Sequence, residues 1–166
     1  MNIAALPAGE SVFIDANVFI YDFGADPLFG PPSRAFLKRI ETGQIQGYTS
    51  SLVLHNFAHR AMTLEACQTL GWSYAGIARR LRDNPAEIRK LFRFRRMMDA
   101  ILGMGVEVLD VNAEHILLAS DVSRTHGLLS GDALIVEMMW SRSLVNLVSA
   151  DEDFDRVPGL VRYAPI

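Results

Sequence analysis

The stretch SVFIDANVFIY, residues 11–21, joins a strand to a helix within a few residues. Val12 to Ile14 form a short apolar run typical of a strand, and Asp15 ends it. A second apolar segment follows at once and predicts a helix. The connection therefore places one carboxylate, Asp15, at the carboxyl end of a predicted buried strand.

The same alternation continues along the rest of the chain. Long connections between successive strands favour crossover units, and hence a parallel sheet with helices on both faces. No repeat, low-complexity tract or linker-like run divides the chain, so we expect one domain over residues 1–166. The further predicted strands cover 44–50, 106–111, 144–151 and 160–166, and the further predicted helices cover 33–43, 51–69, 84–102, 112–127 and 130–142.

The helix over 84–102 has a strong predicted start. Asn84 is a capping residue type, Pro85 fits the first helical position, and Glu87 stands where a capping box requires an acid. The apolar residues that follow, through Leu102, recur at roughly helical spacing and predict one continuous helix.

Three aspartates stand where such a fold brings chain segments together. Asp15 and Asp151 end two predicted strands, and Asp132 lies in the first turn of the helix before the last main strand. Each alone has a structural explanation, as a helix cap or a turn residue. In parallel sheets, however, ligands bind beyond the carboxyl ends of the strands. Together these carboxylates would repel one another without a cation, so they predict a Mg²⁺ or Mn²⁺ site and metal-assisted phosphodiester hydrolysis.

The composition narrows the class of protein. The chain has 166 residues, of which 50% are hydrophobic and 21% charged, as in ordinary globular domains. No apolar run is long enough to cross a bilayer, and the first residues lack the pattern of a signal peptide. One cysteine, Cys67, permits no intramolecular disulfide, which fits a cytoplasmic protein. The net charge of −3 argues against a surface that is basic overall.

Two other metal sites are disfavoured. The acidic run from Asp151 to Asp155 is unlike an EF-hand, because Arg156 and Arg162 stand where glycine and glutamate are required. His55 and His59 have a helical spacing that zinc sites use, but no third ligand is evident. Packing in the core or a hydrogen bond at the helix edge is the preferred interpretation of both histidines.

Four segments in this order carry a family resemblance: VFIDANVFIY, SSLVLHNFAHR, GLLSGDALIVE and LVSADEDF. Over nearly the whole chain the sequence resembles the PIN-domain ribonucleases, and most of all the VapC-type toxins of bacterial toxin–antitoxin pairs. The resemblance implies an α/β/α sandwich with a central parallel sheet. It also implies RNA cleavage with Mg²⁺ or Mn²⁺ held by three or four acids, an antitoxin partner and a homodimer.

The resemblance also assigns roles to residues of this chain. Asp15, Asp132 and Asp151 match acidic positions that hold metal, and Asp153 is an adjoining candidate ligand. Asn17 matches a polar position two residues after the first aspartate, and we assign it to RNA binding. The glutamate that the family carries in the helix after the second strand is replaced here by Asn56, which we group with the catalytic residues.

With Asn56 in place of a glutamate, the sequence is compatible either with a ribonuclease of reduced activity or with an inactive domain. An amide oxygen can orient a metal-bound water, but an amide cannot accept a proton from it at working pH. Asp22, Glu137 and Asp153 are candidate replacements, and Asp153 is the most plausible. We expect three core aspartates with reduced activity; the alternative is an inactive PIN domain that binds RNA or protein. A small-molecule phosphohydrolase ranks lower, because Asn17 interrupts the D-x-D motif that such enzymes use.

A basic region precedes the third predicted strand. Within it Arg89, Arg93 and Arg96 are expected to share a helical face, and they are our predicted RNA-binding residues. Three interpretations stay open: a solvated helix face, a track for RNA phosphates, or a surface for an acidic partner. Phe92 and Phe94 could stack on bases, although spacing favours a core position for Phe92. The basic residues are Arg79, Arg80, Arg82, Arg89, Lys90, Arg93, Arg95 and Arg96.

Overall fold

The strands form one sheet in which every neighbouring pair runs parallel. This computed structural model describes all 166 residues. The strand order is β3-β2-β1-β4-β5, so β1 is central, and the side chains of Val12, Phe13 and Ile14 are fully buried. The strands are β1 (Ser11–Ile14), β2 (Gln46–Ser50), β3 (Glu107–Leu109), β4 (Asn146–Val148) and β5 (Val161–Tyr163).

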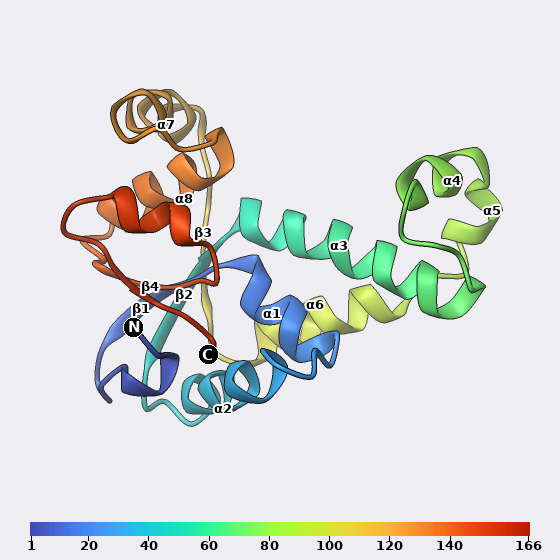
Figure 1. Cartoon of the computed structure of the whole chain (residues 1–166), viewed down its shortest axis with the longest axis horizontal. Coiled ribbons are helices and arrows are strands. Elements are labelled where there is room, and N and C mark those ends of the chain that lie inside the picture. The colour runs from blue at the N-terminus through green and yellow to red at the C-terminus, as the bar shows by residue number, and fades with distance from the viewer.

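Helices cover both faces of the sheet, which confirms the predicted α/β/α sandwich. Figure 1 shows α7 and α8 on one side of the sheet and α1 and α2 on the other. None of the helices combines the length and the apolar composition that a bilayer crossing needs. The helices are α1 (Ala16–Phe23), α2 (Gly30–Glu41), α3 (Ser51–Leu70), α4 (Ile77–Asp83), α5 (Pro85–Ile88), α6 (Arg93–Gly103), α7 (Ala113–His126) and α8 (Ser130–Trp140), with 3₁₀ turns η1 (Ile3–Ala5) and η2 (Glu152–Arg156).

Several element boundaries differ from the sequence-based expectation, among them the start of α2 and the end of β4. The helix expected from Ser33 begins at Gly30, because Pro31 and Pro32 fit the first turn, where backbone N–H groups have no partner within the helix. The strand expected to reach Asp151 ends at Val148. A short loop therefore separates the last main strand from Asp151.

The helix α3 links the sheet to a peripheral lobe. The Ser50 hydroxyl caps its start by accepting from the Val53 N–H, and Gly71 ends it in a left-handed conformation. Twenty residues of α-helix span about 30 Å. Figure 1 shows α3 running from the sheet to α4 and α5 at the far end of the molecule.

The predicted continuous helix over 84–102 is wrong. The helix α5 ends at Ile88, a turn follows at Arg89 and Lys90, and the chain becomes helical again only at Arg93, where α6 begins. The cause is Glu65 of α3, a buried carboxylate that accepts the backbone N–H groups of Phe92, Arg93 and Phe94 at 2.9–3.0 Å. An anion at this point caps a new helix N-terminus.

Further predictions fail at the same break. The Asn84 side chain does not cap α5, because its amide donates to the Arg80 carbonyl. Arg89 precedes the break while Arg93 and Arg96 follow it, so the three do not share one helical face. Phe92, expected in the core, is 55% exposed.

Residues 72–96, which we call the arginine lobe, have a small core of their own. Ile77, Leu81 and Leu91 pack with Ala66 of α3, separately from the main core. Cys67 and Phe94 pack against this cluster as partly buried residues. The lobe is therefore held to α3 by apolar packing as well as by Glu65.

Candidate metal and active site

Asp15 is held at the carboxyl end of the central strand by three hydrogen bonds. Its Oδ1 accepts from the Ala16 N–H at 2.6 Å, which caps α1. Its Oδ2 accepts from Asn17 Nδ2 at 2.6 Å and from Ser149 Oγ at 2.7 Å. Burial raises the pKa of Asp15, and the hydrogen bonds from Ser149 and Ala16 partly offset the rise. Each carboxylate oxygen accepts two bonds, so Oδ1 keeps one free acceptor position.

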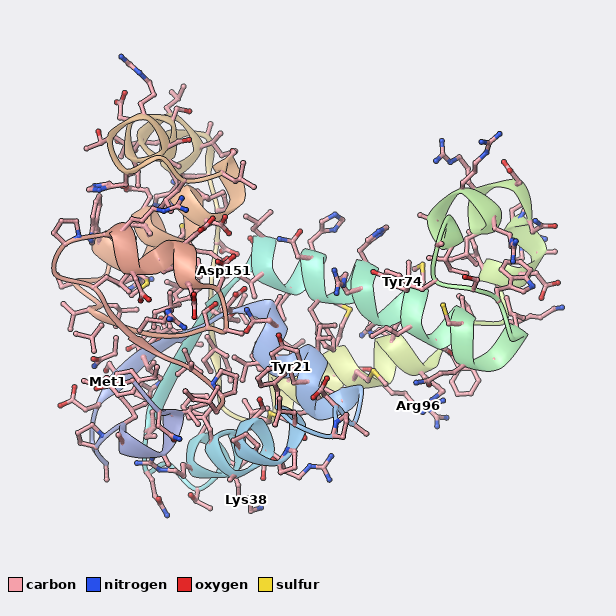
Figure 2. All side chains as sticks on the ribbon, in the orientation of Figure 1. Met1, Tyr21, Lys38, Tyr74, Arg96 and Asp151 are labelled. Atoms are coloured by element: carbon pink, nitrogen blue, oxygen red, sulfur yellow. The ribbon has the colours of Figure 1, made fainter.

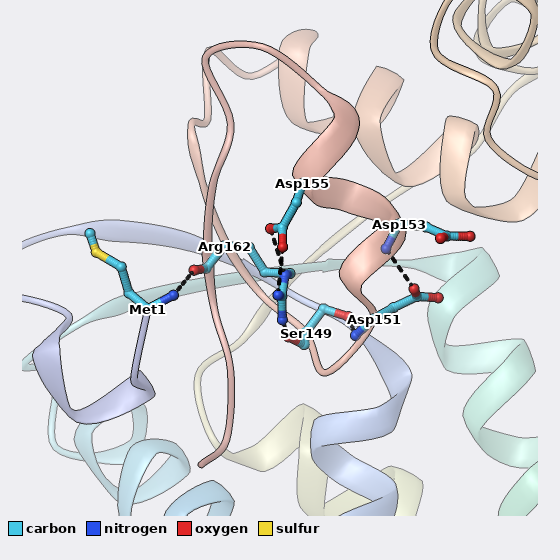
Figure 3. Close-up of polar contacts among 6 residues, drawn as sticks. All are labelled: Met1, Ser149, Asp151, Asp153, Asp155 and Arg162. Atoms are coloured by element: carbon cyan, nitrogen blue, oxygen red, sulfur yellow. Dashed lines mark hydrogen bonds and ion pairs between the residues drawn. The ribbon is translucent and has the colours of Figure 1, made fainter.

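Ser149 links the first and last aspartates and was not singled out from the sequence. Its hydroxyl, fully buried after β4, donates to Asp15 and accepts from Asn17 Nδ2 and from the Asp151 N–H, each at 3.0 Å. Figure 3 shows the contact with Asp151. The only sequence signal was its place as the serine of the S-x-D motif.

Asn17 is occupied within the same network. Its Nδ2 donates to both Asp15 and Ser149, and its Oδ1 accepts from the Ala150 N–H at 3.3 Å. With these contacts the side chain positions the Asp15 carboxylate. Its assignment to RNA binding stays a prediction.

Asp151 and Asp153 lie in the turn after β4. Asp151 Oδ1 accepts from the Asp153 N–H at 2.9 Å and so caps η2. The Asp153 carboxylate forms an ion pair with Arg156 at 2.7 Å. Figure 3 shows Arg162 beside this turn, where it pairs with Asp155 and donates to the Ser149 carbonyl. These arginines fix the turn from its outer side.

Asp132 completes the acidic group from α8. It is partly buried in the first turn of α8, and its carboxylate accepts no hydrogen bond from the protein. Burial, followed by the negative charges of Asp151, Asp15 and Asp153, raises the pKa of Asp132 to about 6. The fold therefore brings Asp15, Asp151 and Asp153 near enough to Asp132 for their charges to act on it.

The donor chemistry of this group fits a hard divalent ion, although it does not form a ready-made cage. No three acidic, histidine or cysteine side chains lie close enough together to hold a metal ion as they stand. Magnesium and manganese are often bound by one or two carboxylates, with water and substrate phosphate as the other ligands. The Asp132 carboxylate accepts no hydrogen bond and lies near three other negative charges, so a bound cation would stabilise its ionised form.

Asn56 lies in the second turn of α3, and its side chain makes no hydrogen bond. Two of its candidate replacements are engaged elsewhere. Asp22 is buried in an ion pair with Arg34 at 2.7 Å. Glu137 lies among the charges of His115 and Glu114 of α7.

His55 and His59 lie on either side of this position and are both exposed. Core packing, the first of the two interpretations preferred from the sequence, is therefore wrong, and neither side chain makes the hydrogen bond that was the other interpretation. Position 56 therefore presents a neutral amide to solvent, and no acid takes its place from the same helix.

Tyr21 is a second residue that the sequence did not indicate. Burial and the charges of Asp26, Asp15 and Asp151 raise the pKa of its phenol, while Arg60 of α3 lowers it. The ring packs against Phe29 with 4.8 Å between centroids. Tyr21 thus lies within the electrostatic reach of both the acidic group and Arg60.

The predicted RNA-binding arginines are separate from the acidic group. Arg89, Arg93 and Arg96 belong to the arginine lobe, and Figure 2 shows Arg96 and Asp151 in different parts of the molecule. Arg93 donates to Gln68 at 3.3 Å, and Arg96 lies over the Phe92 ring at 4.9 Å. These residues do not contact the carboxylates.

The family model of the PIN domain matches residues 12–160, and the chain belongs to that family. The resemblance expected from the sequence is confirmed.

The similar proteins include VapC-type members of the family. Ribonuclease VapC13 of Mycobacterium tuberculosis is 27% identical over 154 residues, 92% of this chain and 99% of the relative. The structure of VapBC2 from Rickettsia felis, bound to a promoter DNA fragment, superposes with a TM-score of 0.61 at 15% identity, over 93% of this chain and 98% of that one. A toxin–antitoxin complex from Klebsiella pneumoniae gives a TM-score of 0.58 at 13% identity, over 90% and 95%. At these identities the two solved structures establish the fold.

Proposed function

We propose that this chain is a divalent-metal-dependent endoribonuclease and the toxin component of a type II toxin–antitoxin pair. The observation that carries the proposal is Asp132, whose carboxylate accepts no hydrogen bond and whose pKa is raised by burial and then by the charges of three neighbouring aspartates. A bound cation would remove this repulsion. Membership of the PIN family and the similarity to a ribonuclease named VapC13 support RNA as the substrate.

Some residues of the site would bind the ion, and others position the residues that bind it. Asp15, Asp132 and Asp151 would ligate Mg²⁺ or Mn²⁺, with Asp153 as an adjoining acid. When bound, the ion supplies a water nucleophile at neutral pH and stabilises charge on the phosphate. Ser149 and Asn17 fix the orientation of the Asp15 carboxylate. Asn56 can accept a hydrogen bond from a water but cannot take its proton, which predicts slow turnover.

A second function is favoured by one observation, the exposed amide at position 56. In this alternative the chain is a PIN domain that binds RNA or protein without cleaving it. The toxin–antitoxin complex among similar structures supports a protein partner, an antitoxin.

The predicted homodimer is tested directly by light scattering of the purified chain.

A cleavage assay separates the two functions. The chain, its Asn56→Glu variant and its Asp15→Asn variant are incubated with mixed RNA, in Mn²⁺ and in chelator. The proposal expects cleavage by the chain in Mn²⁺ only, faster cleavage by Asn56→Glu, and none by Asp15→Asn. Absence of cleavage by both the chain and Asn56→Glu on a broad RNA panel contradicts the proposal and supports the binding function.

A further inference from the structure

Charge is strongly segregated between the arginine lobe and the rest of the chain. Residues 72–96 contain eight lysines and arginines and two acidic residues, Asp83 and Glu87, a net charge of +6. Because the whole chain carries −3, the remainder carries −9. A cationic surface at one end of an otherwise acidic protein attracts polyanions locally.

Most of the lobe's arginines have no carboxylate partner. Arg79, Lys90 and Arg95 form ion pairs with acids three or four residues away in the sequence. The side chains without a carboxylate within 4.0 Å are those of Arg80, Arg82, Arg89, Arg93 and Arg96, and all five are exposed. A charge run that is only a solvated helix face commonly alternates in sign, and this one does not.

Aromatic rings lie among these cations. Arg80 is 5.5 Å from the Trp72 ring centroid, Arg96 is 4.9 Å from that of Phe92, and Arg60 of α3 is 5.9 Å from that of Tyr74. Phe92 and Tyr74 are 55% and 49% exposed. Exposed aromatic rings beside arginines are the combination that binds single-stranded nucleic acid, through base stacking and phosphate contacts. An acidic peptide would be bound by the arginine charges alone and would not require exposed aromatic rings.

A line of side chains leads from the lobe toward the aspartates. Tyr74 contacts Arg60, and the charges of Arg60, Asp15 and Asp151 all act on the Tyr21 phenol. Along the long axis of the molecule, Figure 2 shows Tyr21 between Asp151 and Tyr74. A bound strand would therefore have aromatic and cationic contacts on the way to the acidic group.

We propose that the arginine lobe, together with Arg60, is a docking surface for single-stranded RNA that delivers the strand past Tyr21 to the aspartates. The inference rests on the proposed ribonuclease function, and it concerns where RNA is held. It predicts that binding depends on residues remote from the carboxylates, and that binding persists when cleavage is absent.

Binding is measured separately from cleavage, in the Asp15→Asn background with chelator. The probe is a fluorescein-labelled, mixed-sequence, single-stranded RNA of 20 nucleotides, followed by anisotropy between 50 and 300 mM KCl. The lobe variant carries Arg80→Gln, Arg82→Gln and Arg89→Gln. Its matched control carries Lys38→Gln, Arg124→Gln and Arg142→Gln, which remove the same charge from exposed sites elsewhere.

The lobe variant should bind about 10-fold to 100-fold more weakly at 100 mM KCl, and its log–log salt slope should fall by about 2, since each lost phosphate contact contributes about 0.7 for a single strand. Tyr74→Ala and Phe92→Ala should each weaken binding by about 5-fold to 100-fold without changing the slope. The charge control and Leu117→Ala, an exposed apolar residue of α7, should bind as the parent does. Circular dichroism of every variant establishes that it is folded.

Equal affinity of the lobe variant and its control for RNA would overturn the proposal. The proposal would also be overturned if poly(glutamic acid) bound as tightly as RNA and its binding depended on the same residues. The surface would then recognise negative charge on a protein partner. If the lobe variant loses RNA binding while the chain cleaves no RNA in the earlier assay, the docking surface stands and the proposed enzymatic function fails.

Discussion

The Ser149 hydroxyl donates a 2.7 Å hydrogen bond to Asp15 Oδ2 and so joins the carboxyl ends of the two central strands, β4 and β1. The same hydroxyl accepts from the Asp151 N–H. One side chain thereby sets the position of two predicted metal ligands.

Ser149→Ala should weaken Mn²⁺ binding by about 10-fold to 100-fold, the usual cost of removing a group that orients a ligand. The loss follows because the bond from Ser149 lowers the pKa of Asp15 and its removal favours the protonated acid. Isothermal titration with Mn²⁺ measures the change. Ser120→Ala, at an exposed serine that bonds only within α7, is the control, and equal affinities of the two variants would disprove the role.

Asp132→Asn should stabilise the metal-free protein at pH 7.5. The folded-state pKa of Asp132, about 6, lies above the ordinary value of 3.8, so its charge destabilises the fold fully above about pH 6 and not at all below 3.8. Because solvent screens this half-buried group, we expect a gain of about 1 kcal/mol, or about 2–4 °C in Tm.

Thermal melts in chelator at pH 7.5 and at pH 3.5 check this sign. The gain should vanish at the lower pH. Asp110→Asn, at an exposed loop position, should change Tm little at either pH. A gain that persists at pH 3.5 would show that the effect does not come from the charge of Asp132.

Mn²⁺ should raise the Tm of the parent chain. A ligand present at 100 times its Kd adds about 2.7 kcal/mol, which corresponds to roughly 5–10 °C for a chain of this size. The same concentration should have little effect on Asp132→Asn, which lacks the carboxylate without a hydrogen-bond donor. Scanning fluorimetry with Mn²⁺ and with chelator provides the measurement, and an equal rise in both proteins would exclude Asp132 as a ligand.

Glu65→Gln should lower the free energy of unfolding by about 2–4 kcal/mol. The buried carboxylate accepts three backbone N–H groups, and an amide has only one acceptor oxygen and would face donors with its NH₂ group. The Tm should fall by about 5–15 °C. Glu87→Gln removes a surface ion pair with Lys90 and should cost less than about 1 kcal/mol. Similar Tm values for the two variants would contradict the capping role.

The sequence indicates those residues of the site that stand next to a recognisable local pattern, such as an apolar run or a helix start. Asp15 and Asp132 can be predicted because Asp15 follows an apolar run and Asp132 lies in the first turn of a helix, and the order of the elements predicts the parallel sheet. Ser149 and Glu65 act through partners 134 and at least 27 residues away, so their roles depend on the packing. The break at Phe92 is the same effect: a strong local helix signal is overridden by a carboxylate from another helix.

Glu65 also has a consequence for how this chain can change over generations. It fixes the start of α6 against α3 whatever lies between, so residues 71–91 form a segment whose two ends are anchored side by side. Substitutions at its exposed positions would leave the sheet and its aspartates undisturbed, because the segment has a small core of its own that is separate from the main core. Much of the surface proposed to hold the RNA, including Tyr74, Arg80, Arg82 and Arg89, can therefore change separately from the residues proposed to cleave it.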